Sequence, residues 1–279
     1  MKKLFLLTFA VSITLNSFSQ ELESLVDFNS LASIPIQAQK GRKPLWNGTG
    51  FFLKVNDIIY LITNNHVVGG KYHIDEFNRN NKNSLLKDTL PDILKIRLYD
   101  KKIGSYKYES LGLEDLKGNF LYTKIYENEK DINTLLDVVA IPITGTNSIV
   151  PNIKINIYDS TSIGKIKLYN SQQLFVVGFP QNFSNFYPIW KNGTIASEPN
   201  FTSIGNSTFY IDATTRKGMS GSPVLFRNNI IIDPKEGISF LSGVTTMLIG
   251  IYSAQNFDSE LGLVTRIETI YKTLLNLTN

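Results

Sequence analysis

A succession of short, β-rich apolar runs constrains the fold of this chain more than any other feature. Gly, Pro, Asn and Ser separate the runs at intervals that suit antiparallel barrels or a sandwich. Phe51–Val55 and Ile58–Thr63 are joined by Asn56-Asp57, which predicts a hairpin with a two-residue turn. No segment repeats with a period of about 20–50 residues, which argues against a propeller or solenoid. We therefore expect an all-β protein with further strands at Ile93–Leu98, Phe120–Ile125, Val138–Ile143, Leu174–Val177, Thr208–Ile211, Ser222–Phe226 and Met247–Tyr252.

The N-terminus departs from this strand pattern. Lys2-Lys3 precede the largely apolar run Leu4–Leu15. Asn16-Ser17-Phe18-Ser19 then offers small residues around a cut before Gln20, which is typical of a secretory signal peptide. The apolar run is too short to span a bilayer as a permanent helix. We therefore expect residues 1–19 to be cleaved from an exported protein, periplasmic or secreted, that has no stable membrane anchor.

Other stretches indicate how the mature chain is divided. Residues 74–92 are polar and rich in Asn and Lys, as in a surface insertion, and residues 145–170 suit a connection between two domains. Near the C-terminus, Thr265 and Glu268 form a capping box, and apolar residues recur at helical spacing up to Leu275. This pattern predicts an amphipathic α-helix at the end of the chain.

The composition limits the chemistry that the chain can perform. It contains no cysteine, which excludes disulfide bonds, a thiol nucleophile and a zinc–thiolate site. Only two histidines are present, so an imidazole must come from His66 or His73, and a His-rich metal cluster is excluded. Loss of Lys2 and Lys3 lowers the formal net charge from +4 to +2, too near neutral to indicate nucleic acid or an anionic membrane as a partner.

The segment Gly218-Met219-Ser220-Gly221-Ser222-Pro223 carries the first chemical signal. A serine between glycines can lie on a tight turn where little side-chain bulk blocks a substrate. The backbone N–H groups of Gly218 and Ser220 could then point at one position, as an oxyanion hole requires. An ordinary Gly/Ser/Pro turn is the alternative interpretation.

Two residues could assist such a serine. His66 follows the strand-like run Leu61–Thr63 and could accept the serine proton, although a histidine there can also be purely structural. Asp137 opens the apolar run up to Ile143 and could orient the imidazole, or it could be a turn residue at the end of a strand. Asp131 is the competing carboxylate on a polar loop, and His73 is expected to be exposed.

These segments, in this order, resemble the trypsin-like (chymotrypsin-fold) serine peptidases of bacteria. Gly48-Thr49-Gly50-Phe51 and the Gly-x-Ser-Gly-Ser-Pro segment look most like glutamyl endopeptidases and high-temperature-requirement proteases. The resemblance covers about residues 45–275. It implies a triad of His66, Asp137 and Ser220, an oxyanion hole formed by the N–H groups of Gly218 and Ser220, and neither a cofactor nor a metal.

The same resemblance implies the fold and its division. It predicts two six-stranded antiparallel β-barrels, chymotrypsin-like, followed by the C-terminal α-helix. We expect an N-terminal segment or propeptide at 20–40, a first β-barrel at 41–150, and a second β-barrel with the helix at 151–279.

The resemblance also assigns residues that contact the substrate side chain before the cut: Thr214, Thr215, Tyr252, Ser253 and Gly262. Neither threonine is an acid that would select Arg or Lys, and the substrate-binding strand has no His for a substrate carboxylate. A carboxylate would be desolvated with hydroxyl groups as its only partners, which is unfavourable. We expect Tyr252 to narrow the pocket, Gly262 to leave its far wall open, and Ala, Val, Thr or Leu to be accepted.

Two features depart from the family pattern. Met219 stands where Asp or Asn is usual, which raises the question of how rigidly the oxyanion loop is held. Asn64-Asn65 replace a pair of small residues before the histidine. The predicted function is an exported serine endopeptidase that cleaves a protein or peptide substrate through an acyl-enzyme, with no indication of an oligomeric state. The alternatives are a catalytically silent protease fold that binds a protein or peptide partner, and a structural or adhesive exported β-protein.

Overall fold

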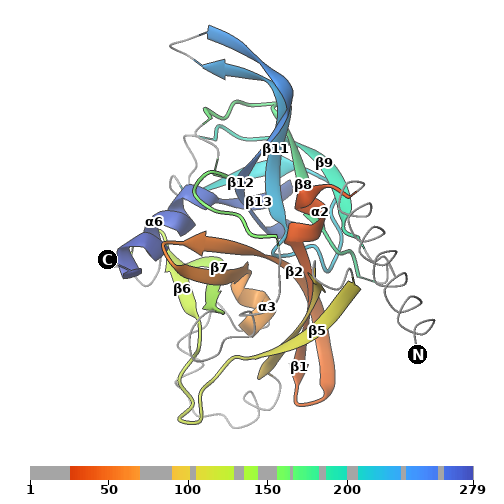
Figure 1. Ribbon diagram of the computed structural model, residues 1–279, viewed down its shortest axis with the longest axis vertical. Coiled ribbons are helices and arrows are strands. Elements are labelled where there is room, and N and C mark those ends of the chain that lie inside the picture. The colour runs from red at the N-terminus through yellow and green to blue at the C-terminus, as the bar shows by residue number, and fades with distance from the viewer. Residues whose placement is uncertain are drawn as a thin grey trace, which may run out of the picture.

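The computed structural model describes residues 26–69, 90–100, 105–128, 135–143, 156–163, 166–181, 187–199, 207–233, 237–256 and 261–278. These residues form a seven-stranded sheet, a closed six-stranded barrel and a C-terminal helix. Figure 1 shows the sheet in the lower half of the molecule and the barrel in the upper half. Every strand pair in both units is antiparallel, so the prediction of an all-β protein is confirmed at this level.

The first sheet has the strand order β5-β4-β1-β2-β3-β7-β6. The predicted hairpin is confirmed, because Val55 pairs with Ile58 across the turn and Asn56 has a positive φ of 51°. The strands are β1 (Ser33–Lys40), β2 (Lys43–Val55), β3 (Ile58–Thr63), β4 (Ile93–Asp100), β5 (Ser105–Gly112), β6 (Thr123–Tyr126) and β7 (Leu135–Pro142).

The first sheet differs from the expected six-stranded barrel, because it contains seven strands. Strand β1 comes from the range 20–40 and pairs with β2 on one side and β4 on the other. Its alternating residues Ile34, Ile36 and Ala38 are almost fully buried, which explains why this segment adds a strand. Among the described strands, β5 and β6 end the sheet and do not pair with each other.

The second unit is a closed barrel with the strand order β10-β13-β12-β11-β8-β9, as predicted for the C-terminal half. Strands β11 and β12 extend beyond the barrel as a long hairpin at the top of Figure 1. The segment between β10 and β11 carries Ser220. The strands are β8 (Gln173–Gly178), β9 (Ile189–Ile195), β10 (Thr208–Asp212), β11 (Pro223–Asp233), β12 (Gly237–Asn256) and β13 (Leu261–Arg266).

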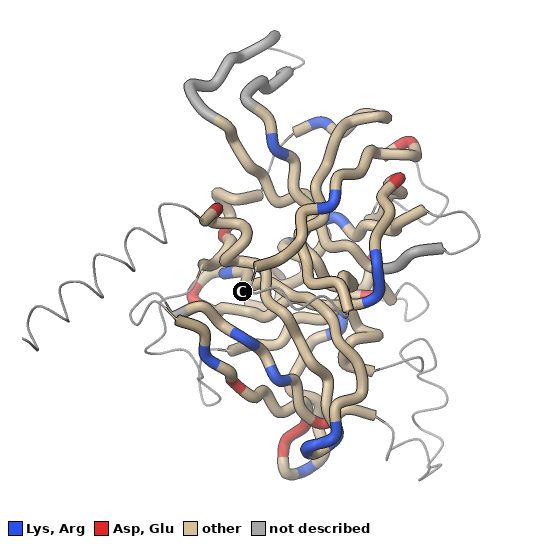
Figure 2. The backbone as a smooth tube through the Cα atoms, turned by 90° about the vertical axis from the view of Figure 1, so that its right-hand side faces the viewer, with Lys and Arg blue, Asp and Glu red and all other residues tan. Residues whose placement is uncertain are grey.

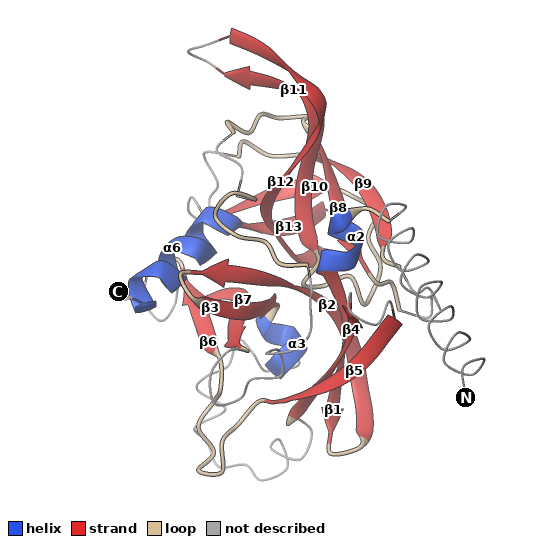
Figure 3. Ribbon diagram, viewed as in Figure 1, coloured by secondary structure: helices blue, strands red, loops and turns tan. Residues whose placement is uncertain are grey.

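Three helices are described: α2 (Phe28–Ala32), α3 (Asn65–Gly69) and α6 (Ile267–Thr278), which Figure 3 colours blue. The predicted C-terminal helix is confirmed as α6, which buries Ile267, Ile270 and Leu274. The predicted capping box is wrong: Thr265 belongs to strand β13, and its hydroxyl lies 3.2 Å from the hydroxyl of Ser253. None of the helices in the described ranges is long and apolar enough to cross a lipid bilayer.

One of the apolar clusters in the described part of the chain contains residues of both halves. Tyr158, from the segment predicted to connect the domains, exchanges backbone hydrogen bonds with Phe52 and Lys54 of β2, at 2.9 and 2.8 Å. Farther along the same segment, Ile163 forms a bridge with Leu248 of β12. This packing fixes the position of the sheet relative to the barrel. The shared cluster contains Phe51, Leu53, Ile62, Val138, Tyr158, Val177, Leu225, Leu248, Ile251, Ile267, Ile270 and Leu274.

Charged residues of both signs occur in both halves of the described chain (Figure 2). Some of them form ion pairs, with Arg227 2.8 Å from Asp27 and Lys40 3.6 Å from Asp92. The mixed distribution agrees with the small net charge of +4.

Candidate active site

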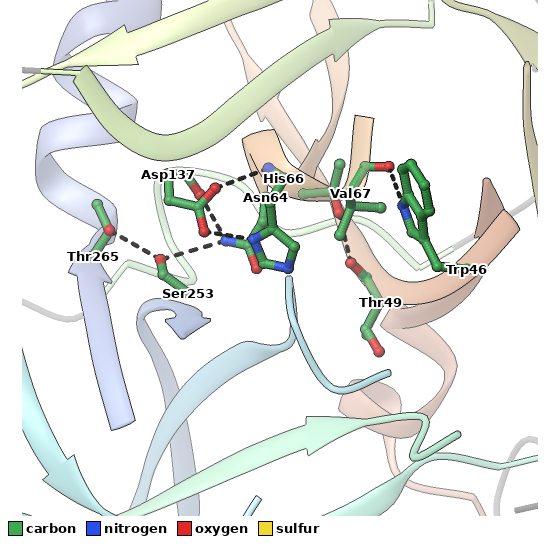
Figure 4. A network of polar contacts seen from close by, with 9 residues as sticks. Trp46, Thr49, Asn64, His66, Val67, Asp137, Ser253 and Thr265 are labelled. Carbon is green, nitrogen blue, oxygen red and sulfur yellow. Dashed lines mark hydrogen bonds and ion pairs between the residues drawn. The ribbon is translucent and has the colours of Figure 1, made fainter. Parts of the chain in front are cut away.

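His66 and Asp137 are brought together by the pairing of β3 with β7. Thr63 at the end of β3 pairs with Val139, and helix α3 begins directly afterwards, so His66 lies beside the start of β7. One oxygen of Asp137 accepts the backbone N–H of His66 at 2.9 Å, and the other lies 2.7 Å from the ring Nδ1 (Figure 4). A carboxylate at Nδ1 favours the tautomer with the proton there, which leaves the lone pair on Nε2.

Asn64 connects this pair to the barrel. Its side-chain amide donates to the backbone carbonyl of Asp137 at 2.7 Å and lies 3.4 Å from the hydroxyl of Ser253. Ser253 in turn contacts Thr265, and all three side chains are buried (Figure 4). Ser253 was predicted to contact substrate, whereas the structure places its hydroxyl in this buried network. The Asn64-Asn65 pair before the histidine was the sequence signal for the network, but its partners could not be predicted.

Ser220 lies on the loop that joins β10 to β11 and is half-buried, between the buried residues Met219 and Gly221. Two turns shape this loop: the N–H of Met219 donates to Arg216, and the N–H of Ser222 donates to Met219. Gly218 and Gly221 have φ values of 92° and 88°, a conformation that favours glycine. The motif therefore forms the sharp turn that the sequence predicts.

The backbone N–H groups of Gly218 and Ser220 donate no hydrogen bond to another group in the described part of the chain. The carbonyl of Lys217 accepts the N–H of Gln181 at 2.6 Å. Because the peptide bond is planar and trans, the N–H of Gly218 points away from that contact. Two such N–H groups, separated by one residue, can stabilise an oxyanion.

Met219 anchors the loop by burial. Its side chain is 0% exposed and packs in the apolar cluster of the barrel together with Ile211, Val224 and Tyr252. An aspartate at this position would leave a charge without water in this cluster, which is costly. The loop is therefore held by the apolar contacts of Met219 with the barrel, in addition to its backbone hydrogen bonds.

The backbone of Ser220 lies close to helix α3. Its carbonyl accepts the N–H of Thr49 at 2.7 Å. At the neighbouring Gly48, a Cβ atom would lie 2.8 Å from the Val67 side chain and 3.5 Å from the Ser220 carbonyl. Ser220 and the residue that follows His66 thus flank the same glycine.

The residues predicted to contact the substrate side chain occupy different environments. Thr214 is exposed, whereas Thr215 is buried and its hydroxyl lies 2.5 Å from the hydroxyl of Tyr252. A Cβ atom at Gly262 would lie 2.6 Å from Cε2 of Tyr252, so the ring covers the space beside Gly262 that was expected to be open. Burial raises the pKa of Tyr252, although its hydrogen bond with Thr215 acts in the opposite direction.

The two competing candidates, His73 and Asp131, lie outside the described residues. Within the described ranges, no group of three or more His, Cys, Asp or Glu side chains is arranged to hold a metal ion.

Comparisons with known proteins show what this chain is similar to. Residues 48–230 match the family model described as "Trypsin-like peptidase domain". Similar solved structures include that of Deg5, with 19% identity, 87% coverage of each chain and a TM-score of 0.47. The serine endoprotease from Yersinia pestis is 14% identical over 90% of this chain and 66% of that chain, with a TM-score of 0.47. The active form of the Rv3671c protease from M. tuberculosis is 14% identical over 88% and 80% of the two chains, with a TM-score of 0.48. No curated protein sequence matches the chain.

Proposed function

Because this chain belongs to the family of trypsin-like peptidase domains, we propose that it is a serine endopeptidase with a triad of Ser220, His66 and Asp137. The observation that carries the proposal is the double contact of Asp137, which binds both the backbone N–H and the ring Nδ1 of His66. These two contacts hold both the backbone and the ring of His66 in α3, and they direct Nε2 away from the carboxylate. In this proposal, the seven-stranded sheet stands in place of the first β-barrel expected for the family.

The proposed reaction proceeds through an acyl-enzyme. The hydroxyl of Ser220 attacks the scissile carbonyl while Nε2 of His66 accepts its proton, and the imidazolium is stabilised by Asp137. The N–H groups of Gly218 and Ser220 stabilise the oxyanion, and the imidazolium then protonates the leaving amine. Water, activated by the same histidine, releases the acyl group and restores the serine.

The substrate side chain before the cut is proposed to be uncharged and small to medium in size, such as Ala, Val, Thr or Leu. The Tyr252 ring against Gly262 and the Tyr252–Thr215 contact support this choice, because they fill space that a large side chain would need. Tyr252, Thr215 and Gly262 carry no charge that would compensate a buried ionic side chain of the substrate.

Export of the enzyme is part of the proposal. The signal peptide predicted at residues 1–19 would direct the mature chain to a periplasm or to the medium, where protein or peptide substrates are cleaved. Mass spectrometry of the secreted chain gives the N-terminus: a start at or near Gln20 supports the proposal, and a chain that keeps Met1 or Lys2 contradicts it.

A fluorophosphonate probe tests the peptidase function directly. The wild-type chain is expected to be labelled and Ser220→Ala is expected not to be, while the exposed control Ser105→Ala is labelled as fast as the wild type. The second readout is hydrolysis of a peptide library, which is expected for the wild type and Ser105→Ala but not for Ser220→Ala. A folded wild type that neither reacts nor cleaves would instead favour the silent module that binds a peptide partner.

A further inference from the structure

Every polar group of Thr49 in β2 forms a hydrogen bond with another part of the chain. It is 0% exposed, and its hydroxyl donates to the carbonyl of Gly218 at 2.8 Å while accepting the N–H of Phe179 at 3.1 Å. Its N–H donates to the carbonyl of Ser220 at 2.7 Å. Its own carbonyl accepts the hydroxyl of Thr63 at 2.8 Å.

The loop that carries Ser220 therefore contacts this residue of the opposite sheet at several points. Thr49 binds the carbonyls on both sides of Met219, which belong to Gly218 and Ser220. A Cβ atom at Gly221 would overlap the carbonyl oxygen of Thr49, so the loop also approaches through a glycine. The backbones of Thr49 and Gly221 are therefore too close to leave room for a side chain at position 221.

Thr49 is also connected to the strand that leads to the histidine. Thr63, which binds the Thr49 carbonyl, is the last residue of β3, and α3 with His66 begins two residues later. The same threonine thus contacts both the loop of Ser220 and the end of β3. No other residue in the described part of the chain donates a hydrogen bond to both Gly218 and Ser220.

On the basis of the proposed function, we infer that Thr49 is a positioning residue that sets the oxyanion loop and its distance from His66. The Gly218 carbonyl and the Gly218 N–H belong to successive peptide planes joined at one Cα atom. Fixing the carbonyl through Thr49, and the preceding Lys217 carbonyl through Gln181, defines both planes. The Gln181 contact sets the plane that contains the N–H of Gly218, and the Thr49 contact sets the adjoining plane. The two contacts together orient this N–H relative to the rest of the loop before substrate arrives, and catalysis depends on such prior orientation.

Three variants of the mature chain separate positioning from stability. Thr49→Val replaces the hydroxyl by a methyl group of similar volume, and Thr49→Ser keeps the hydroxyl. Ser33→Ala is the matched control, because the Ser33 hydroxyl is also buried and also donates from the first sheet to a barrel carbonyl, that of Val177 at 2.7 Å. Melting temperatures, kcat and KM for a peptide substrate, and the rate of fluorophosphonate labelling are measured for each.

We expect Thr49→Val to lower kcat and the labelling rate by about tenfold to a hundredfold with little change in KM, since misplaced groups cost rates of this order. Thr49→Ser should recover most of the rate, and Ser33→Ala should melt earlier but keep its kcat. Equal kcat values for Thr49→Val and Ser33→Ala would overturn the inference, as would a Thr49→Ser variant as slow as Thr49→Val.

Hydrogen exchange separates failure of this inference from failure of the proposed function. If the wild type is not labelled by the probe, the peptidase function fails, and exchange of residues 216–221 decides the role of Thr49. Faster exchange of that segment in Thr49→Val than in Ser33→Ala supports the positioning of the loop. The same exchange in both variants contradicts it.

Discussion

Asp137 binds His66 at two points, the backbone N–H at 2.9 Å and the ring Nδ1 at 2.7 Å. The two residues are separated by 71 positions in the chain and meet because β3 and β7 are neighbours. A single carboxylate therefore positions both the main chain and the imidazole of the same histidine.

Asp137→Asn should keep the fold and lower kcat by about ten-thousandfold, because an amide does not favour the tautomer that leaves Nε2 free. Peptide hydrolysis and circular dichroism measure the two effects. Asp92→Asn is the control, since Asp92 forms surface contacts with Lys40 and Gly41. A loss of less than about tenfold would mean that another carboxylate, Asp131 first, orients the histidine.

Tyr252→Val should widen the range of accepted side chains. Removing the ring opens space beside Gly262, so cleavage after Leu or Phe should increase relative to cleavage after Ala by about tenfold or more. Tyr252→Phe keeps the ring and should retain the preference for small side chains. Peptide-library digests measure the ratio, and an unchanged ratio in Tyr252→Val would show that the substrate side chain binds elsewhere.

Met219 should tolerate an apolar replacement but not an aspartate. Met219→Leu should lower the free energy of unfolding by less than about 1.5 kcal/mol, because volume and polarity are nearly conserved. Met219→Asp buries a carboxylate in the apolar cluster and should cost more than about 4 kcal/mol or prevent folding. Urea denaturation compares the two, and similar midpoints would contradict the sealed environment of this side chain.

Gly221→Ala should abolish activity through a steric effect. Its φ of 88° disfavours a side chain, and a Cβ atom there would overlap the Thr49 carbonyl oxygen, so the loop must move. Gly118→Ala is a matched control, because Gly118 has a φ of 81° but no atom within 4 Å of the added Cβ. We expect the control to lose about 1–2 kcal/mol of stability and to keep its activity. Activity of Gly221→Ala above about one hundredth of wild type would exclude the tight contact with Thr49.

Several elements could be predicted because their signals are local. The β2–β3 hairpin follows from a polar two-residue turn between β-rich runs, and α6 follows from apolar residues at helical spacing. The turn around Ser220 follows from two glycines at positive φ. Strand β1 was not predicted, because polar residues and Pro35 alternate with its buried side chains and weaken the apolar signal.

Long-range partners could not be predicted in the same way. Thr265 reads as a helix cap in the sequence, but packing of β12 against β13 places its hydroxyl beside Ser253. Tyr252 was expected to narrow a pocket with an open wall, yet its ring lies against the glycine of that wall. In both cases the partner is set by strand register across the barrel, which single residues do not encode.

The sequence by itself determined the chemistry available to this protein: two histidines, of which His66 follows a strand-like run, a serine between glycines, and no thiol. It also determined the strands and turns, because apolar alternation and backbone preferences act between neighbouring residues. Only the tertiary structure decided which polar groups meet. Thr49 binds Gly218 across 169 positions in the chain because an apolar cluster joins the two sheets, and a buried hydroxyl must find its acceptor among the segments that the packing brings within reach.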